Sequence, residues 1–258
     1  MSSVEYKNLT WCEIKKCIDD KRILIFCVGA IEQHGPHLPV GVDAFLPMEI
    51  ARRVAQRTGA IVAPCTNYGY KSLVRAGGGP HFKGSIGLTG ETVILLVKDI
   101  IKNFIREGWR KILVLDWHLE NVPFVFEGVD EAVREADLGE DLKVVKIDNP
   151  NGIGIKTDPA LFDDLFGDDF PGWAVEHAAI WETSAMMAAF PQLVRNDAVI
   201  DGRPPQPFDY DVLPVPKDSA PESGVFWKAT RASQEKGKRI IAAVTEGMLR
   251  VINEEFNK

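Results

Sequence analysis

The fold is decided by an apolar run near the N-terminus, ILIFCVGA at residues 23–30. Three further runs have the same character: AIVAPC at 60–65, KILVLDW at 111–117 and KVVKID at 143–148. Each is short and rich in β-branched or aliphatic residues, with little alternation of polar and apolar side chains. That pattern is typical of parallel strands buried on both faces. The four runs therefore predict the strands of a parallel sheet.

Helical patterns lie between these runs. One helix is predicted over residues 45–57 and a second over residues 89–106, where Thr89 can cap the N-terminus and Gly108 follows as a stop. Alternation of strand and helix predicts an α/β fold, a three-layer α/β/α sandwich with a mostly parallel central sheet. Ligands bind beyond the carboxyl ends of the strands in such sheets, so functional residues should follow strands.

The second half of the chain is less regular. Residues 149–172 contain several glycines and five aspartates from Asp158 to Asp169. They are expected to form a long irregular loop, either a solvated acidic excursion or a lid over a binding site. A helix is predicted over residues 177–190.

Two further patterns follow. The six prolines of residues 203–221 exclude regular structure and indicate an extended surface crossing or an oligomer contact. An apolar residue at every fourth position then predicts a last helix whose stripe lies in the core or in an interface. The stripe comprises Ile240, Val244, Met248, Ile252 and Phe256. We find no internal repeat, and we expect residues 1–258 to form a single domain.

The composition excludes several classes of function. Thirty Lys+Arg against 37 Asp+Glu give a net charge of -7, the wrong sign for a partner such as nucleic acid or an anionic membrane surface. The longest apolar stretch, residues 23–31, is far shorter than the roughly 20 residues that span a bilayer. The 4 cysteines show no Cys-x-x-Cys spacing, so we expect a cytoplasmic protein without disulfides.

Side chains that can bind a metal gather directly after the first strand. The segment GAIEQHGPHLPVGVD at 29–43 contains Glu32, His34, His37 and Asp43. Glu32 and His34 are two residues apart, so they point to the same side if the chain is extended. The glycine and proline turns that follow can bring Asp43 back toward them. One loop can therefore supply three ligands.

A second group follows the third strand. His118 and Glu120 repeat the two-residue spacing and should meet the first group at the same edge of the sheet. If Asp43 bridges two ions, Glu32 and His118 hold one of them. His34 and Glu120 then hold the other, and open positions remain for water and substrate. Carboxylate and imidazole ligands suit Zn or Mn.

The chain resembles the creatininase (creatinine amidohydrolase) family of dinuclear metal hydrolases. The resemblance rests on GAIEQHGPHLPVGVD at 29–43, DWHLEN at 116–121 and EHAAIWETS at 176–184, with weaker agreement at 80–88 and 232–237. It implies the same fold and two divalent ions, Zn and/or Mn, on the five ligands Glu32, His34, Asp43, His118 and Glu120. It also implies a homo-oligomer, since members of the family assemble as hexamers.

The resemblance also implies roles for further residues. The counterpart of His177 in the family delivers a proton to the leaving nitrogen. Glu176 is a candidate proton relay, and His177, Glu120 and Glu176 are the candidate catalytic residues. Trp173 resembles a tryptophan that lines the family's substrate pocket, and His37 is a second candidate for substrate binding.

Other residues have simpler interpretations. Glu182, in the middle of a predicted helix, is expected to have a hydrogen-bonded structural role. The run Gly77-Gly78-Gly79 lacks the Lys-Ser/Thr of a phosphate loop and is expected to let the backbone pass close to the site. Cys65 follows a strand and would be the nucleophile of a Cys-dependent hydrolase, although a buried, inert cysteine is the commoner case.

These patterns predict a metal-dependent amidohydrolase that opens a small cyclic amide such as creatinine. A hydroxide shared by two ions would attack the carbonyl, and His177 would protonate the departing atom. Creatininase carries a tryptophan on a mobile loop, whereas residues 149–172 contain none. A related hydrolase that cleaves a C–C bond of a cyclic ketone, such as a cyclitol-derived diketone, therefore stays open as an alternative. An inactive metal-binding or regulatory subunit is a second alternative.

Overall fold

A four-stranded parallel sheet forms the centre of the molecule. The computed structural model describes residues 3–205, 209–216 and 218–256. Within them the strand order is β2-β1-β3-β4. The strands are β1 (Leu24–Val28), β2 (Ile61–Val62), β3 (Lys111–Asp116) and β4 (Lys143–Ile147). Leu24 pairs with Ile61 on one side and with Ile112 on the other, both in parallel register. All four predicted strands are thus present.

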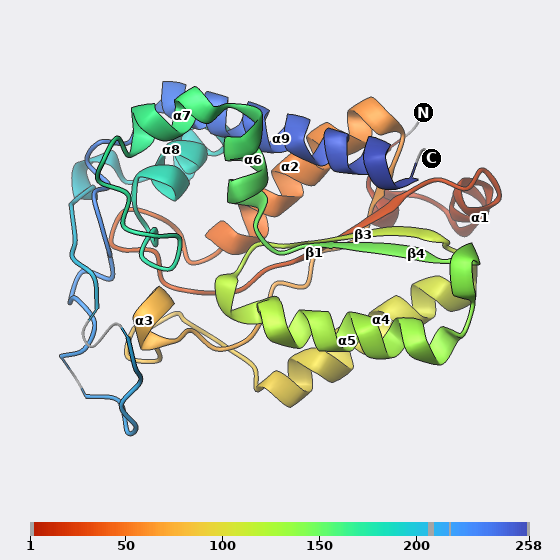
Figure 1. The fold of residues 1–258 in the computed structure, drawn as a ribbon, viewed down its shortest axis with the longest axis horizontal. Coiled ribbons are helices and arrows are strands. Elements are labelled where there is room, and N and C mark those ends of the chain that lie inside the picture. The colour runs from red at the N-terminus through yellow and green to blue at the C-terminus, as the bar shows by residue number, and fades with distance from the viewer. Residues whose placement is uncertain (1–2, 206–208, 217, 257–258) are drawn as a thin grey trace.

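Helices cover both faces of this sheet, as Figure 1 shows. They are α1 (Trp11–Asp19), α2 (Val42–Thr58), α3 (Val74–Gly77), α4 (Gly90–Glu107), α5 (Val122–Ala136), α6 (Pro150–Thr157), α7 (Pro159–Leu165), α8 (Ile180–Ala189) and α9 (Gln234–Phe256). Helices α4 and α5 lie together on one face, and α2, α8 and α9 lie on the other. The predicted three-layer α/β/α sandwich is confirmed.

The ends of α4 follow from the local sequence. The Thr89 hydroxyl accepts a hydrogen bond from the backbone N–H of Thr92, which satisfies one of the free donors at the helix start. Gly108 ends the helix in the left-handed region at φ 112°, where a side chain would be strained. Both features are as predicted.

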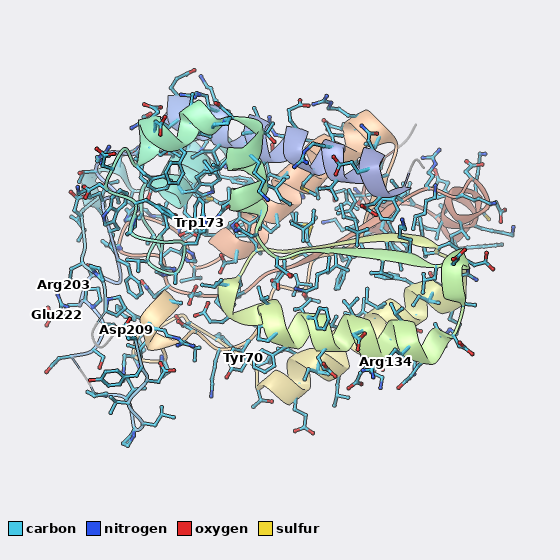
Figure 2. The ribbon with its side chains drawn as sticks, in the orientation of Figure 1. Tyr70, Arg134, Trp173, Arg203, Asp209 and Glu222 are labelled. Atoms are coloured by element: carbon cyan, nitrogen blue, oxygen red, sulfur yellow. The ribbon has the colours of Figure 1, made fainter. Side chains whose placement is uncertain are left out.

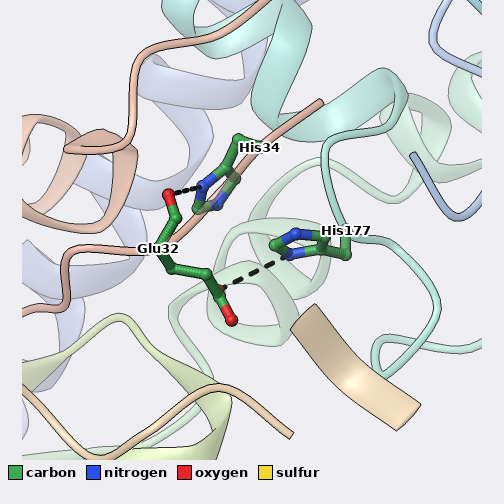
Figure 3. Close-up of side chains that lie close together, drawn as sticks. All are labelled: Glu32, His34 and His177. Atoms are coloured by element: carbon green, nitrogen blue, oxygen red, sulfur yellow. Dashed lines mark hydrogen bonds and ion pairs between the residues drawn. The ribbon is translucent and has the colours of Figure 1, made fainter. Parts of the chain in front are cut away.

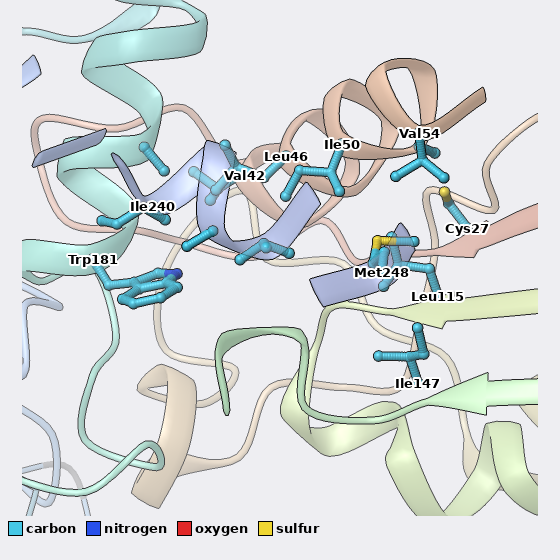
Figure 4. Close-up of a cluster of buried hydrophobic side chains, with 14 of the residues drawn as sticks. Cys27, Val42, Leu46, Ile50, Val54, Leu115, Ile147, Trp181, Ile240 and Met248 are labelled. Atoms are coloured by element: carbon cyan, nitrogen blue, oxygen red, sulfur yellow. The ribbon is translucent and has the colours of Figure 1, made fainter. Parts of the chain in front are cut away.

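Two apolar clusters hold the layers together, because successive side chains of a strand point to opposite faces. Ile25 and Cys27 face α2, α8 and α9, whereas Leu24 and Phe26 face α4 and α5. Figure 4 shows part of the first cluster, with Met248 of α9 near Leu115 and Ile147 of the sheet. The predicted stripe of α9 is buried along its whole length, so it belongs to the core.

The irregular loop expected over residues 149–172 is wrong for most of its length, because α6 and α7 lie within it. Each helix has a proline in its first turn, where no N–H is needed. Each is capped by the preceding polar side chain, Asn149 or Asp158, which accepts a backbone hydrogen bond. Leu161 and Leu165 of α7 are buried in the first cluster. The Asn-Pro and Asp-Pro pairs therefore start helices instead of marking a loop.

The helix predicted over residues 177–190 begins three residues later, at Ile180. Ala178 has φ 53°, in the left-handed region that a non-glycine residue rarely adopts, so the chain cannot be helical there. His177 consequently lies in the irregular segment before α8.

The described residues of the proline-rich stretch contain no helix or strand, as predicted, while residues 206–208, with Pro207, and residue 217 lie outside the described residues. None of the helices in the described part of the chain is both long and apolar enough to cross a bilayer. The expected cytoplasmic location stays a prediction.

Candidate metal centre and catalytic pocket

The structure brings the five predicted ligands together at the carboxyl edge of the sheet. Glu32 and His34 follow β1, Asp43 lies in the first turn of α2, and His118 and Glu120 follow β3. None of the five is more than 8% exposed. Charged side chains are rarely buried to this extent unless they are paired or bind a metal.

His34 is oriented by a backbone carbonyl. Its Nδ1 lies 3.0 Å from the carbonyl oxygen of Glu32, so Nδ1 carries a proton and donates it to that oxygen. Figure 3 shows this contact. Nε2 lies 3.6 Å from Asp43 Oδ1 and 3.4 Å from Glu182 Oε1. A histidine that donates one N–H to a carbonyl and turns its other nitrogen toward carboxylates has the arrangement of a metal ligand.

His118 has the same arrangement with its ring nitrogens exchanged. Its Nε2 lies 3.1 Å from the carbonyl oxygen of Tyr70, which accepts its proton. Its Nδ1 lies 3.4 Å from Glu32 Oε2 and 3.4 Å from Asp43 Oδ2. The two oxygens of Asp43 thus face two different imidazoles, which is the placement that a bridging carboxylate needs.

Several of these atoms are buried without a hydrogen-bond partner among the described residues: Glu32 Oε1, His34 Nε2 and Asp43 Oδ2. A buried polar atom without a partner costs free energy, so their clustering fits cations that would coordinate them. Burial raises the pKa of Glu32, but the charge of His118 and its contact with the carboxylate outweigh burial and lower that pKa to about 2. Glu32 is therefore ionised, as a ligand must be.

The structure does not place Glu120 beside His34, which is the pairing expected from sequence spacing, and Glu120 instead joins Glu32 and His118 in a possible metal-binding group. Glu182 of α8 lies beside His34 instead, while Glu120 Oε2 lies 3.5 Å from His118 Nε2 and Glu120 Oε1 accepts the backbone N–H of Leu73 at 2.9 Å. Burial raises the pKa of Glu120 to about 7.

Sequence reasoning favoured a hydrogen-bonded structural role for Glu182, with support of a metal ligand as the alternative, and did not place it among the metal ligands. The available signal was its position as the one charged residue in the run AAIWETSAMMAA at 178–189. A carboxylate in an otherwise apolar, buried helix needs a partner.

Gly77 makes room for Glu32. A Cβ atom on Gly77 would lie 1.6 Å from Glu32 Oε1, so any side chain there would displace the carboxylate. The prediction that this glycine run lets the backbone pass close to the site is confirmed at Gly77.

His177 faces the ligands from the opposite side, as Figure 3 shows. Its Nε2 lies 2.8 Å from the carbonyl oxygen of Gln33, and its Nδ1 lies 3.7 Å from Glu32 Oε2. The rings of His34 and His177 have centroids 4.5 Å apart. Burial lowers the pKa of His177, so the ring is neutral at pH 7 and Nδ1 can accept a proton.

Glu176 and Trp173 line the same pocket as His177, a hollow of about 210 Å³ that also contains most of the candidate ligands. Glu176 Oε1 accepts the backbone N–H of Trp181 at 2.7 Å, and Oε2 has no hydrogen-bond partner in the part of the chain that the structure describes. Burial, together with the charge of Glu182, raises the pKa of Glu176 well above its usual range. Trp173, labelled in Figure 2, packs edge-on against Trp181 with ring centroids 5.4 Å apart.

The structure does not bring His37 or Cys65 into this pocket. His37 is fully buried, and its Nε2 lies 2.9 Å from the Thr183 hydroxyl. This position suits a packing role behind His34. The Cys65 thiol donates to the carbonyl of Thr66, and burial raises the pKa of Cys65 to about 12. A thiol that stays protonated is a poor nucleophile.

The chain is similar to known proteins over nearly its whole length. The Creatininase family model, described as creatinine amidohydrolase, matches residues 7–252. Creatinine amidohydrolase of Pseudomonas putida is 40% identical over 258 residues, which cover 98% of each chain. The 3-dehydro-scyllo-inosose hydrolase of Thermotoga maritima is 27% identical over 283 residues, covering 99% of this chain and 85% of the relative. A solved structure described as creatininase Mn superposes with a TM-score of 0.93 at 39% identity, covering 99% of this chain and 100% of that one.

Proposed function

The chain belongs to the creatininase family, and on that premise we propose that it opens a small cyclic amide of the creatinine class with two divalent cations. The resemblance recognised in its three sequence blocks is confirmed, and so is the expectation that it is an enzyme, a hydrolase. The substrate, the number of ions and the role of each residue are the content of the proposal.

The observation that carries the proposal is the position of Asp43 between two imidazoles. We assign Glu32, Asp43 and His118 to one ion. We assign His34, Asp43 and Glu182 to the other. Three protein ligands for each ion leave positions open for water and substrate, and the set suits Zn or Mn. When bound, such ions lower the pKa of water and polarise a carbonyl oxygen.

His177 is the proposed proton carrier. The carbonyl of Gln33 holds Nε2–H at 2.8 Å and so turns Nδ1 toward the pocket. Because the ring is neutral at pH 7, Nδ1 can take up a proton and pass it to the leaving nitrogen. General acid–base catalysis of this kind contributes typically 10²- to 10⁴-fold.

Two carboxyl groups support this proton transfer in our proposal. Glu120, with a pKa of about 7, can exchange a proton near neutral pH. Glu176 is held protonated by burial beside Glu182 and is the proposed relay. Trp173 supplies a flat apolar wall for the ring of the substrate.

Ring opening followed by NMR tests the proposal. Purified protein loaded with Mn or Zn should convert creatinine to creatine, a chelated sample should not, and returning the metal should restore turnover. Chelation that removes the metal but leaves turnover intact would contradict the metal-dependent part. A thiol-blocking reagent serves as a control and should have no effect, because the Cys65 thiol is protonated.

A second candidate is hydrolysis of a C–C bond in a cyclic ketone. Two observations favour it: the Thermotoga maritima relative is named a 3-dehydro-scyllo-inosose hydrolase, and residues 149–172 contain no tryptophan. The same pocket would serve, with His177 protonating carbon instead of nitrogen. Incubation with oxidised inositols in the same NMR assay distinguishes the two. Absence of turnover on every ring compound would favour the inactive, metal-binding alternative.

We also propose that residues 1–258 act as one domain and assemble as a homohexamer, like other members of the family. The family model spans residues 7–252, and both apolar clusters share one sheet. Multi-angle light scattering measures the subunit number directly.

A further inference from the structure

An apolar pocket opens beside the candidate metal centre. It has a volume of about 540 Å³, and it shares Ala76, Leu119 and Glu120 with the 210 Å³ pocket that contains the candidate ligands. The two hollows are therefore adjacent along a common wall. Glu120 borders both hollows, so the apolar pocket lies directly beside the candidate metal centre.

The walls of this apolar pocket are held in place. The rings of Tyr70 and Phe124 have centroids 4.1 Å apart, and Figure 2 shows Tyr70 toward α5. The Tyr70 carbonyl accepts from His118 Nε2 at 3.1 Å, and its N–H donates to Asn121 Oδ1 at 2.6 Å. The aromatic wall is thus tied to the loop that carries the candidate ligand His118. A preformed pocket of this kind binds without the entropy cost of ordering its walls.

The pocket presents apolar surface and no free charge among its lining residues. Leu119 is 47% exposed and contributes to the apolar surface of this pocket. Arg75 lies 3.6 Å from Asp211, so its charge already has a partner. Glu120, at the inner end, accepts the N–H of Leu73. An occupant of this pocket therefore gains most from an apolar group.

We propose that this pocket binds an alkyl or aryl substituent on the cyclic substrate while the ring itself lies at the metal centre. The inference rests on the proposed function and names its substrate class: cyclic amides with an apolar arm, in preference to creatinine itself. One methylene in a hydrophobic pocket changes kcat/KM by roughly 10- to 200-fold, so an aromatic arm should have a large effect.

The test compares creatinine with its analogue in which benzyl replaces the N-methyl group. With the full, metal-loaded chain, kcat/KM for the benzyl compound should exceed that for creatinine by at least about 10-fold. Equal or lower kcat/KM for the benzyl compound would overturn the inference.

Variants of the lining residues test whether the benzyl preference arises in the apolar pocket. Leu73→Trp fills the pocket and should reduce the benzyl preference by at least about 10-fold. The matched control is Phe126→Ser, because Phe126 is a 56% exposed residue of α5 outside the pocket, and this variant should keep the preference. If Leu73→Trp does not fold, Leu119→Asn makes the same wall polar at a largely exposed position. A preference that survives both wall variants contradicts the assignment.

Calorimetry separates this inference from the proposed function. If neither compound is opened, the proposed function fails. The affinities of the two compounds, measured by calorimetry, still test whether the pocket binds an apolar arm. The benzyl analogue should bind wild-type protein at least about 10-fold more tightly than creatinine and lose that advantage in Leu73→Trp. Equal affinities, as expected if a second copy of the chain covers the pocket, would overturn it.

Discussion

Glu182 Oε1 lies 3.4 Å from His34 Nε2, although the two residues are far apart in the chain. The other oxygen of Glu182 accepts the backbone N–H of Ala178 at 2.7 Å, so the carboxylate joins α8 to the loop after β1. Asp43 approaches the same nitrogen of His34 with Oδ1. A second cation bound here, as we propose, would have three protein ligands without Glu120.

Replacing Glu182 should remove one of the two ions. In Glu182→Gln the amide is a weak ligand, so we expect the metal content measured by mass spectrometry after dialysis to fall from two ions per chain toward one. Loss of an ion beside His34 and Asp43 should also abolish most turnover, because the reaction needs both cations in our account.

The matched variant is Glu120→Gln, which removes one carboxylate from the same pocket. It should retain both ions and lose turnover through the proton transfer assigned to Glu120. The opposite result, in which Glu120→Gln loses an ion and Glu182→Gln keeps two, would restore the pairing expected from sequence spacing.

His177→Ala should lower kcat by roughly 10²- to 10⁴-fold and leave the metal content unchanged, because the ring moves a proton and is not assigned to an ion. Steady-state kinetics with parallel metal analysis measures both quantities. A variant with wild-type kcat would remove His177 from the mechanism, and a variant depleted of metal would make it a ligand.

Gly77→Ala should disrupt the ion held by Glu32 and His118. The new methyl group would lie 1.6 Å from Glu32 Oε1, so the carboxylate must move. We expect metal affinity to fall at least about 10-fold. This is the lower end of the loss that is typical when a residue that positions a metal ligand is changed. Gly139→Ala is the control, since its Cβ meets nothing within 4 Å and it is remote from the candidate ligands. The left-handed φ of 54° at Gly139 strains an alanine there, so this control should lose some stability but keep its metal affinity. Equal metal affinity in the two variants would show that Glu32 is not held as described.

His37 predicts a specific dependence of stability on pH. Burial lowers its pKa from 6.5 to about 4, with a contribution from the charge of His34. Between these pH values the unfolded chain binds more protons at this position than the folded chain does, so acidification destabilises the fold. The difference between the two pKa values of His37 corresponds to about 3 kcal/mol of folding free energy.

Urea unfolding of metal-free protein at pH 7 and pH 4.5 measures the contribution of His37 to stability. Because the protein contains no metal in this experiment, loss of bound metal at low pH cannot be the cause of a change. Acidification from pH 7 to pH 4.5 should lower the free energy of unfolding of both proteins. The decrease should be about 2 to 3 kcal/mol smaller in His37→Gln than in wild type. Identical losses in the two proteins would show that His37 titrates normally.

The layered fold and most of the site could be predicted because their signals are local. The β1 run is continuously apolar, and the residues that follow it return to the same edge through the glycine and proline turns before Asp43. The start and end of α4 are likewise set by Thr89 and Gly108, each within a few residues of the helix.

The features that sequence analysis did not predict depended on tertiary contacts or on ambiguous local signals. Glu182 meets His34 only because α8 packs across α2 and α9, which no spacing within either segment indicates. Asn149 and Asp158 precede prolines, and the same pairs can begin a turn or cap a helix. The helices that follow Asn149 and Asp158 pack against α9, and this packing favours the helix over a turn.

Anomalous diffraction from crystals grown with Mn or Zn tests the central claim most directly. Two peaks should flank Asp43, one contacting Glu32 and His118 and the other contacting His34 and Glu182. A single peak, no peak, or a second ion bound by Glu120 in place of Glu182 would contradict the account.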